Sequence, residues 1–178
     1  NEIHSGRDAV MLLIAKSLGG LSFPKLMEVY MEGNRENGAD RYPGETPDRQ
    51  LALAEEDFRE YLSQVFFAAE GAAYFILEEE GRYVSALRLE PYEDGLLLEA
   101  LETAPEERRK GYAAHLICET AAHLKKSGPV RLYSHVLRGN TASLRTHEKC
   151  GFRQISDCAR YIDGSVNRRA VTLLYTEN

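Results

Sequence analysis

The stretch Thr103-Ala-Pro-Glu-Glu-Arg-Arg-Lys-Gly-Tyr-Ala-Ala-His-Leu116 decides the fold of this chain. It follows an apolar segment at 96–101 that predicts a strand, and it leads directly into the amphipathic pattern of a helix at 111–126. A helix N-terminus presents unpaired backbone N–H groups and the positive end of the helix dipole, which together suit a phosphate group. The stretch therefore predicts a strand, a basic turn and a helix that form a pyrophosphate-binding cradle.

The side chains of this turn support the same interpretation. Gly111 lets a ligand approach the backbone closely, and Ala113 keeps the next inward position small. Arg108, Arg109 and Lys110 add positive charge around the same spot. The two-glycine dinucleotide fingerprint does not fit, because the turn contains a single glycine. A solvated basic turn that only caps the helix is the alternative.

A second informative segment is Asn140-Thr-Ala-Ser-Leu-Arg-Thr-His-Glu-Lys-Cys-Gly-Phe152. It predicts a short helix with Asn140 at the N-cap and Gly151 just past the end in a left-handed conformation. Asn140, Ser143 and His147 lie near one stripe of that helix, so we expect them to face a common ligand.

Both segments resemble the GCN5-related N-acetyltransferase (GNAT) superfamily. The spacing Arg108-x-x-Gly111-x-Ala113 resembles its acetyl-CoA signature, and 140–152 resembles its asparagine-to-Gly-Phe segment. The resemblance is specific for 96–155, only topological for 72–95 and 156–176, and absent before residue 70. It implies an α/β (α+β) fold with a mixed, mostly antiparallel central sheet, flanking helices and splayed central strands that admit a pantetheine arm.

The resemblance also implies acetyl-CoA as co-substrate. The residues it assigns to binding are Leu101, Glu102, Thr103, Arg108, Arg109, Lys110, Gly111, Tyr112, Ala113, Asn140 and Ser143. His147 stands where the family often has Tyr, so we expect it beside the thioester sulfur, where it assists departure of the thiolate. The alternative is that His147 only packs in the core.

Transfer to an amine requires a base, because a primary amine with a pKa of about 10.4 must lose a proton before it attacks. His135, on the predicted strand 130–137, ranks first, Glu99 second and Glu102 third. Strand alternation predicts that Glu99 and Glu102 lie on opposite faces of the sheet. A structural role for His135 stays open.

The predicted function is transfer of an acetyl group from acetyl-CoA to a primary amine by direct attack in a ternary complex. One alternative is a non-catalytic CoA-binding or regulatory domain, and another is acetylation of a peptide or protein amine. The acceptor itself is not predicted, since the resemblance fails before residue 70.

We expect one domain over 1–178, with a helical acceptor-side or lid region at 1–70 and the sheet and acetyl-CoA-binding core at 71–178. The expected strands are 10–15, 73–79, 82–89, 95–103, 130–137, 152–161 and 170–176. Helices are expected at 22–34 and from Thr46 onward, separated by a Gly-rich loop at 33–48 that could form a lid.

Composition limits the remaining classes. With 43% apolar residues, 28% charged residues and a net charge of -6, the chain is an ordinary globular protein and does not suit general nucleic-acid binding. The apolar run at 9–15 is too short to span a bilayer. Three cysteines without scaffold spacing indicate a reduced, cytoplasmic protein. A homodimer is left open.

No metal is expected. His115, Glu119 and His123 share one stripe of the predicted helix, but no HExxH motif or further ligand cluster accompanies them. A solvent-facing stripe is the preferred interpretation.

Overall fold

The computed structural model describes residues 10–178, so the first nine residues of the predicted N-terminal region lie outside it. Its centre is a seven-stranded sheet of order β1-β2-β3-β4-β5-β9-β6, and β7 and β8 form a separate two-stranded sheet. The strands are β1 (Met11–Ala15), β2 (Ala73–Glu79), β3 (Arg82–Tyr92), β4 (Gly95–Thr103), β5 (Val130–Leu137), β6 (Arg153–Ser156), β7 (Ala159–Arg160), β8 (Val166–Asn167) and β9 (Ala170–Glu177). Within residues 10–178, β4–β5 is the single parallel pair and every other pair is antiparallel.

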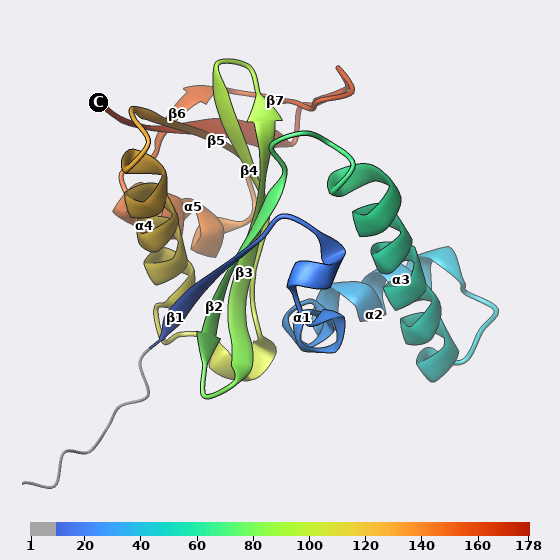
Figure 1. Ribbon diagram of the computed structural model, residues 1–178. Coiled ribbons are helices and arrows are strands. Elements are labelled where there is room, and N and C mark those ends of the chain that lie inside the picture. The colour runs from blue at the N-terminus through green and yellow to red at the C-terminus, as the bar shows by residue number, and fades with distance from the viewer. Residues whose placement is uncertain (1–9) are drawn as a thin grey trace, which may run out of the picture.

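Helices cover both faces of this sheet, with α4 and α5 on one side and α1, α2 and α3 on the other (Figure 1). The helices are α1 (Phe23–Val29), α2 (Met31–Arg41), α3 (Pro47–Tyr61), α4 (Tyr112–Lys125) and α5 (Thr141–Lys149), with short turns η1 (Leu18–Gly20), η2 (Leu62–Phe66) and η3 (Pro105–Glu107). A mostly antiparallel sheet flanked by helices confirms the predicted fold class. No helix in the described part of the chain is both long and apolar enough to cross a membrane.

The side chains of the sheet alternate between two apolar layers. Leu87 and Leu98 pack with Leu116 of α4 in the larger layer. Tyr74 and Ala86 pack in the second layer, which the helices before residue 70 cover. We call the first side the α4 face and the second side, after the predicted position of the acceptor, the acceptor face. The alternation lets each strand residue be assigned to one face or the other.

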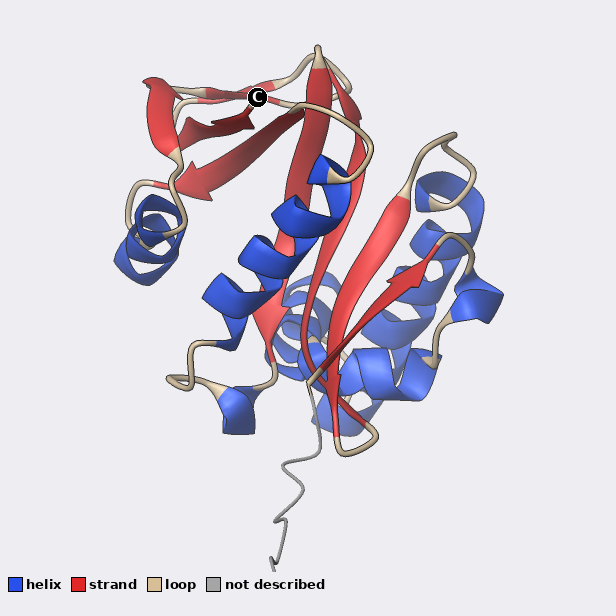
Figure 2. Cartoon of the chain, turned by 60° about the vertical axis from the view of Figure 1, so that its left-hand side comes forward, coloured by secondary structure: helices blue, strands red, loops and turns tan. Residues whose placement is uncertain are grey.

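The parallel junction between β4 and β5 is short. The two strands pair only at Leu96–Leu132, Leu97–Tyr133 and Leu98–Ser134, whereas β4 continues to Thr103 and β5 to Leu137. Beyond the junction the two strands diverge, and their facing backbone edges are not paired with each other. In Figure 2 the strands near the C-terminus run away from the long β3–β4 hairpin. The predicted splay of the central strands is therefore present.

The prediction of a loop at 33–48 is wrong, because α2 occupies most of that segment. The loop was predicted because this segment contains three glycines. Gly38 lies where α2 crosses α3, and a Cβ on it would lie 2.4 Å from the carbonyl oxygen of Gln50. Glycine is therefore needed here for close packing of two helices. The helix expected at 22–34 is divided at Tyr30, which is the C-cap of α1 and the N-cap of α2.

The strand expected at 152–161 is also divided. β6 pairs with β9 at the edge of the main sheet, whereas β7 leaves the sheet and pairs with β8 around the turn that contains Gly164. The β7–β8 hairpin brings Tyr161 next to the sheet, where its ring contacts His135.

Candidate active site

The predicted cradle lies between the end of β4 and the start of α4. Arg109 and Gly111 both adopt left-handed conformations, with φ of 65° and 82°, and Gly111 is the N-cap of α4. No side chain of residues 10–178 caps this helix, so its first N–H groups have no intrahelical or side-chain partner in that range. A Cβ on Gly111 would meet no atom within 4 Å, which shows open space beside the backbone. This geometry suits an anion.

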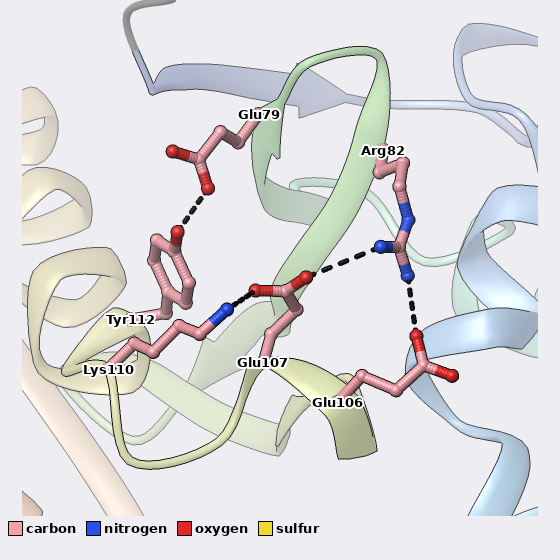
Figure 3. A network of polar contacts seen from close by, with 6 residues as sticks. All are labelled: Glu79, Arg82, Glu106, Glu107, Lys110 and Tyr112. Atoms are coloured by element: carbon pink, nitrogen blue, oxygen red, sulfur yellow. Dashed lines mark hydrogen bonds and ion pairs between the residues drawn. The ribbon is translucent and has the colours of Figure 1, made fainter. Parts of the chain in front are cut away.

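An ion-pair network ties the cradle to the β2–β3 hairpin (Figure 3). Arg82, at the start of β3, contacts Glu106 at 3.0 Å and Glu107 at 3.3 Å. Glu107 also accepts a hydrogen bond of 2.7 Å from Lys110. The carboxylate of Glu107 thus joins the hairpin to the loop that precedes α4, and it holds that loop against the sheet.

The side chain of Tyr112 points away from the cradle and toward β2. Its hydroxyl donates to Glu79, and this hydrogen bond raises the pKa of Tyr112 to about 12 (Figure 3). A ligand in the cradle would therefore meet the backbone of Tyr112 and not its phenol. The next residue, Ala113, is half-buried in the first turn of α4.

Two of the three predicted cations are already paired. Arg108 contacts Glu32 of α2 at 2.7 Å and Glu102 of β4 at 3.3 Å. Lys110 is held by Glu107, whereas Arg109 has no carboxylate partner among residues 10–178. Judged from the described residues, one cation at the cradle is therefore unpaired, where the sequence predicted three.

A β-bulge in β4 changes which side chains reach the acceptor face. Arg88 pairs with Glu99 and Ala86 pairs with Glu102, so β4 carries one more residue than β3 between these pairs. Ala100, inside the bulge, has a φ of 49°. Because of the extra residue, Glu99 and Glu102 lie on the same face of the sheet. The prediction that they lie on opposite faces is wrong.

The backbone after the bulge is held by β3. The Ser85 hydroxyl donates to the Glu102 carbonyl at 2.9 Å and lies 3.1 Å from the Thr103 hydroxyl. The Leu101 side chain packs toward the α4 face. Leu101, Glu102 and Thr103, three of the residues predicted to bind acetyl-CoA, are thus held on one side by β3. The opposite backbone edge of this segment faces the gap between β4 and β5.

Glu99 and His135 flank the entrance to this gap. They are the first residues after the last paired position, Leu98–Ser134, one on each strand. Both lie on the acceptor face, since Leu97 and Tyr133, two positions earlier, pack together on that side. The two leading candidates for the base are therefore neighbours in the fold.

His135 sits between two aromatic rings, with ring centroids 5.6 Å from Tyr92 and 5.2 Å from Tyr161, both edge-to-face. Its Nε2 is buried and has no hydrogen-bond partner in the described part of the chain. Burial lowers the pKa of His135, so the ring is neutral at physiological pH. A buried ring nitrogen without a partner does not fit a satisfied structural histidine.

Glu99 is a partly buried carboxyl group with a near-neutral pKa. Burial is the main cause, the neighbouring Glu90 carboxylate adds to it, and together they raise the pKa of Glu99 to about 7. Arg88 opposes the shift from 3.8 Å. The Arg88 guanidinium lies over the rings of Tyr61 and Phe66, at 5.0 and 5.4 Å from their centroids. Glu99 can therefore exchange a proton near pH 7.

His147 is placed differently from the prediction. It is only 1% exposed. Its Nδ1 donates to the Ser143 carbonyl at 2.7 Å, and its Nε2 lies 2.8 Å from the Ser134 hydroxyl. The ring packs edge-to-face on Phe152. Neither ring nitrogen is free to donate to a leaving thiolate, so the contacts fit the packing alternative and not the predicted acid.

The N-terminus of α5 matches the sequence. Asn140 is the N-cap, and its side-chain oxygen accepts the Ser143 N–H at 3.1 Å. Gly151, just past the helix, has a φ of 95° as predicted for a left-handed stop. The Ser143 hydroxyl faces the His147 ring at 3.3 Å.

Several residues that shape the acceptor face were not predicted from the sequence. Glu90 and Arg88 could have been found, because they alternate with buried residues on one strand and therefore share a face. Tyr92 lies two positions further along the same face. No sequence pattern indicated Tyr161, because it reaches His135 from the β7–β8 hairpin, which was not predicted.

Within residues 10–178 no group of three or more His, Cys, Asp or Glu side chains has the arrangement of a metal site. His115 and Glu119 form an exposed pair at 3.4 Å on α4.

Comparisons with known proteins agree with the observed fold. The model of the acetyltransferase (GNAT) family matches residues 35–152, which is more than half of the chain. No curated protein matches significantly. Among solved structures, the ribosomal-protein-S18-alanine N-acetyltransferase of Escherichia coli has a TM-score of 0.59 at 19% identity, over 93% of this chain and 94% of that chain.

Two further structures contain coenzyme A. The PaiA N-acetyltransferase of Thermoplasma acidophilum, in complex with coenzyme A, has a TM-score of 0.59 at 18% identity and covers 94% of this chain and 99% of its own. The spermidine N-acetyltransferase of Vibrio cholerae, in complex with CoA and spermine, has a TM-score of 0.57 at 18% identity and covers 94% and 95%. At these identities the likeness concerns the fold.

Proposed function

Because the chain belongs to the GNAT acetyltransferase family, we propose that it transfers an acetyl group from acetyl-CoA to a primary amine by direct attack in a ternary complex. One observation carries the proposal: the loop at 104–111 joins the unpaired edge of β4 to the uncapped N-terminus of α4. A phosphate site and a gap in the sheet therefore adjoin. Acetyl-CoA has the matching chemistry, a pyrophosphate at one end of a chain that bears amides and a thioester.

The pyrophosphate is assigned to the backbone N–H groups from Gly111 to Ala113, with Arg109 as the unpaired cation. The pantetheine arm is assigned to the unpaired edge of β4 at 101–103. Amides of the arm can exchange hydrogen bonds with this edge as a neighbouring strand would. Asn140 and Ser143 are assigned to the same ligand from the side of α5.

In the reaction, the neutral amine nitrogen attacks the thioester carbonyl, a C–N bond forms and the C–S bond breaks. The amine proton passes to a base, and the thiolate takes up a proton to leave as CoA thiol. We assign the base to Glu99, because its pKa of about 7 lies near the working pH. His135, on the other strand at the same entrance, is the competing candidate.

The acceptor is proposed to be a cationic amine, on a small molecule or on a peptide. Glu90, Glu99 and Glu102 all lie on the acceptor face, and aromatic rings accompany them. Carboxylates and aromatic rings both attract ammonium groups. The named activities of two similar structures, on spermidine and on a ribosomal-protein alanine, involve amines of both kinds.

A screen of amines with acetyl-CoA, read by release of free thiol, tests the proposal. Polyamines, amino acids, aminoglycosides and peptides form the panel, and hydrolysis without amine is the blank. We expect release above the blank for at least one cationic class, and loss of that release in Gly111→Glu. CoA binding without release from any amine would instead support the non-catalytic CoA-binding alternative.

A further inference from the structure

Arg108 connects the cradle to the acceptor side of the molecule. It belongs to the loop before α4, yet its guanidinium contacts Glu32 on α2 at 2.7 Å and Glu102 on β4 at 3.3 Å. Glu32 lies in the first turn of α2, and Glu102 lies on the acceptor face after the bulge. One side chain therefore joins a cofactor-binding loop to two elements that border the acceptor.

This arrangement conflicts with a simple role as a phosphate ligand. A guanidinium that holds two carboxylates is neutralised by them, so it must change partners before it can neutralise a phosphate. The side chains of Arg108, Glu32 and Glu102 are 40%, 52% and 39% exposed, so both pairs are weak and can be exchanged. A pyrophosphate carries more negative charge than either carboxylate, and its oxygens can accept hydrogen bonds from the same planar guanidinium N–H groups.

The other paired cation of the loop does not have this property. Lys110 contacts Glu107, which lies three residues earlier in the same loop. A change of partner by Lys110 would leave α2 untouched. When Arg108 breaks its ion pair with Glu32, in contrast, it releases α2, and the two residues are 76 positions apart in the sequence.

We propose that Arg108 exchanges partners when acetyl-CoA binds, leaving Glu32 and Glu102 for the phosphate, and thereby couples occupation of the cradle to the acceptor-side helix α2. This inference rests on the proposed function. Its energetic consequence is that Glu32 competes with the cofactor. Removal of Glu32 should therefore strengthen cofactor binding, and it should do so only when Arg108 is present.

A double-mutant cycle tests the proposal, with the dissociation constant of coenzyme A measured by titration calorimetry. Glu32→Gln should bind CoA about two- to fivefold more tightly than the parent, which is the strength of an exposed ion pair. Arg108→Gln should bind CoA about tenfold more weakly, as expected for loss of a charged hydrogen bond. In the Arg108→Gln background, Glu32→Gln should change the affinity by less than about 1.5-fold, because the pair is already absent.

Glu36→Gln is the matched control, since Glu36 is an exposed carboxylate one turn further along α2. It reports the general effect of removing one negative charge from this helix. The proposal is overturned if Glu32→Gln strengthens CoA binding no more than Glu36→Gln does, if it weakens binding, or if its effect persists without Arg108. Absence of CoA binding to the parent would instead overturn the proposed function, so the two failures are distinguishable.

Discussion

Replacing Glu99 with glutamine should stabilise the protein at alkaline pH. The pKa of Glu99 is about 7 in the folded protein, against an ordinary value of 4.5. Between these values the folded state keeps a proton that the unfolded state has lost, so the free energy of unfolding falls as pH rises from about 4.5 through 7. With 1.36 kcal/mol for each pKa unit, the loss at pH 8 amounts to at most about 3 kcal/mol.

Glutamine keeps the size of the side chain and cannot ionise. Glu99→Gln should therefore match the parent at pH 5 and exceed it at pH 8, by up to roughly 6–12 °C in Tm for a chain of this size. Thermal unfolding at pH 5, 6, 7 and 8 measures the difference. Glu60→Gln, which replaces an exposed carboxylate on α3, should follow the parent at every pH. If Glu99→Gln and the parent lose stability in parallel from pH 5 to 8, Glu99 is ionised throughout and the reasoning fails.

Three further predictions concern the cradle, the buried histidine and the base. CoA at one hundred times its dissociation constant should stabilise the parent by about 2.7 kcal/mol. Gly111→Glu, which places a carboxylate at a φ of 82°, should gain no stability from CoA. A thermal shift with CoA equal to that of the parent would show that the cradle lies elsewhere. His147→Phe should lower the free energy of unfolding by about 1–3 kcal/mol, measured in denaturant, because the Ser134 hydroxyl loses its buried partner. Turnover by the folded variant should stay near the parental rate, and a large loss of turnover would restore the acid role. Glu99→Gln should slow acetyl transfer about 10²–10⁴-fold and remove an acid limb near pH 7, with a smaller effect from His135→Ala; the reverse order would assign the base to His135.

Local signals in the sequence predicted the parts of the site that depend on neighbouring residues. The turn before α4 and the N-cap of α5 were predicted because Gly111 and Asn140 act on the backbone next to them. Resemblance to the family supplied the splay of the strands, which periodicity alone does not indicate. The family assignment is confirmed by the match over residues 35–152.

The remaining features depend on contacts between segments far apart in the chain. Gly38 indicated a loop until its contact with Gln50 of α3 was known. The bulge at Ala100 contains no glycine or turn residue, so the sequence does not predict it. The bulge nevertheless determines on which face of the sheet Glu102 lies. His147 of α5 is buried against Phe152, and Ser134 on β5 occupies its Nε2.

The three-pair junction between β4 and β5 also divides the main sheet into two antiparallel ladders. β1 to β4 form one continuous antiparallel ladder, and β5, β9 and β6 form another. Only three residue pairs join them, so those amides at 96–98 that point toward β5 should report separation of the two ladders. A ligand that contacts both ladders opposes this separation. Its protection against exchange should therefore concentrate at the junction, even though the proposed phosphate site lies at the far end of β4.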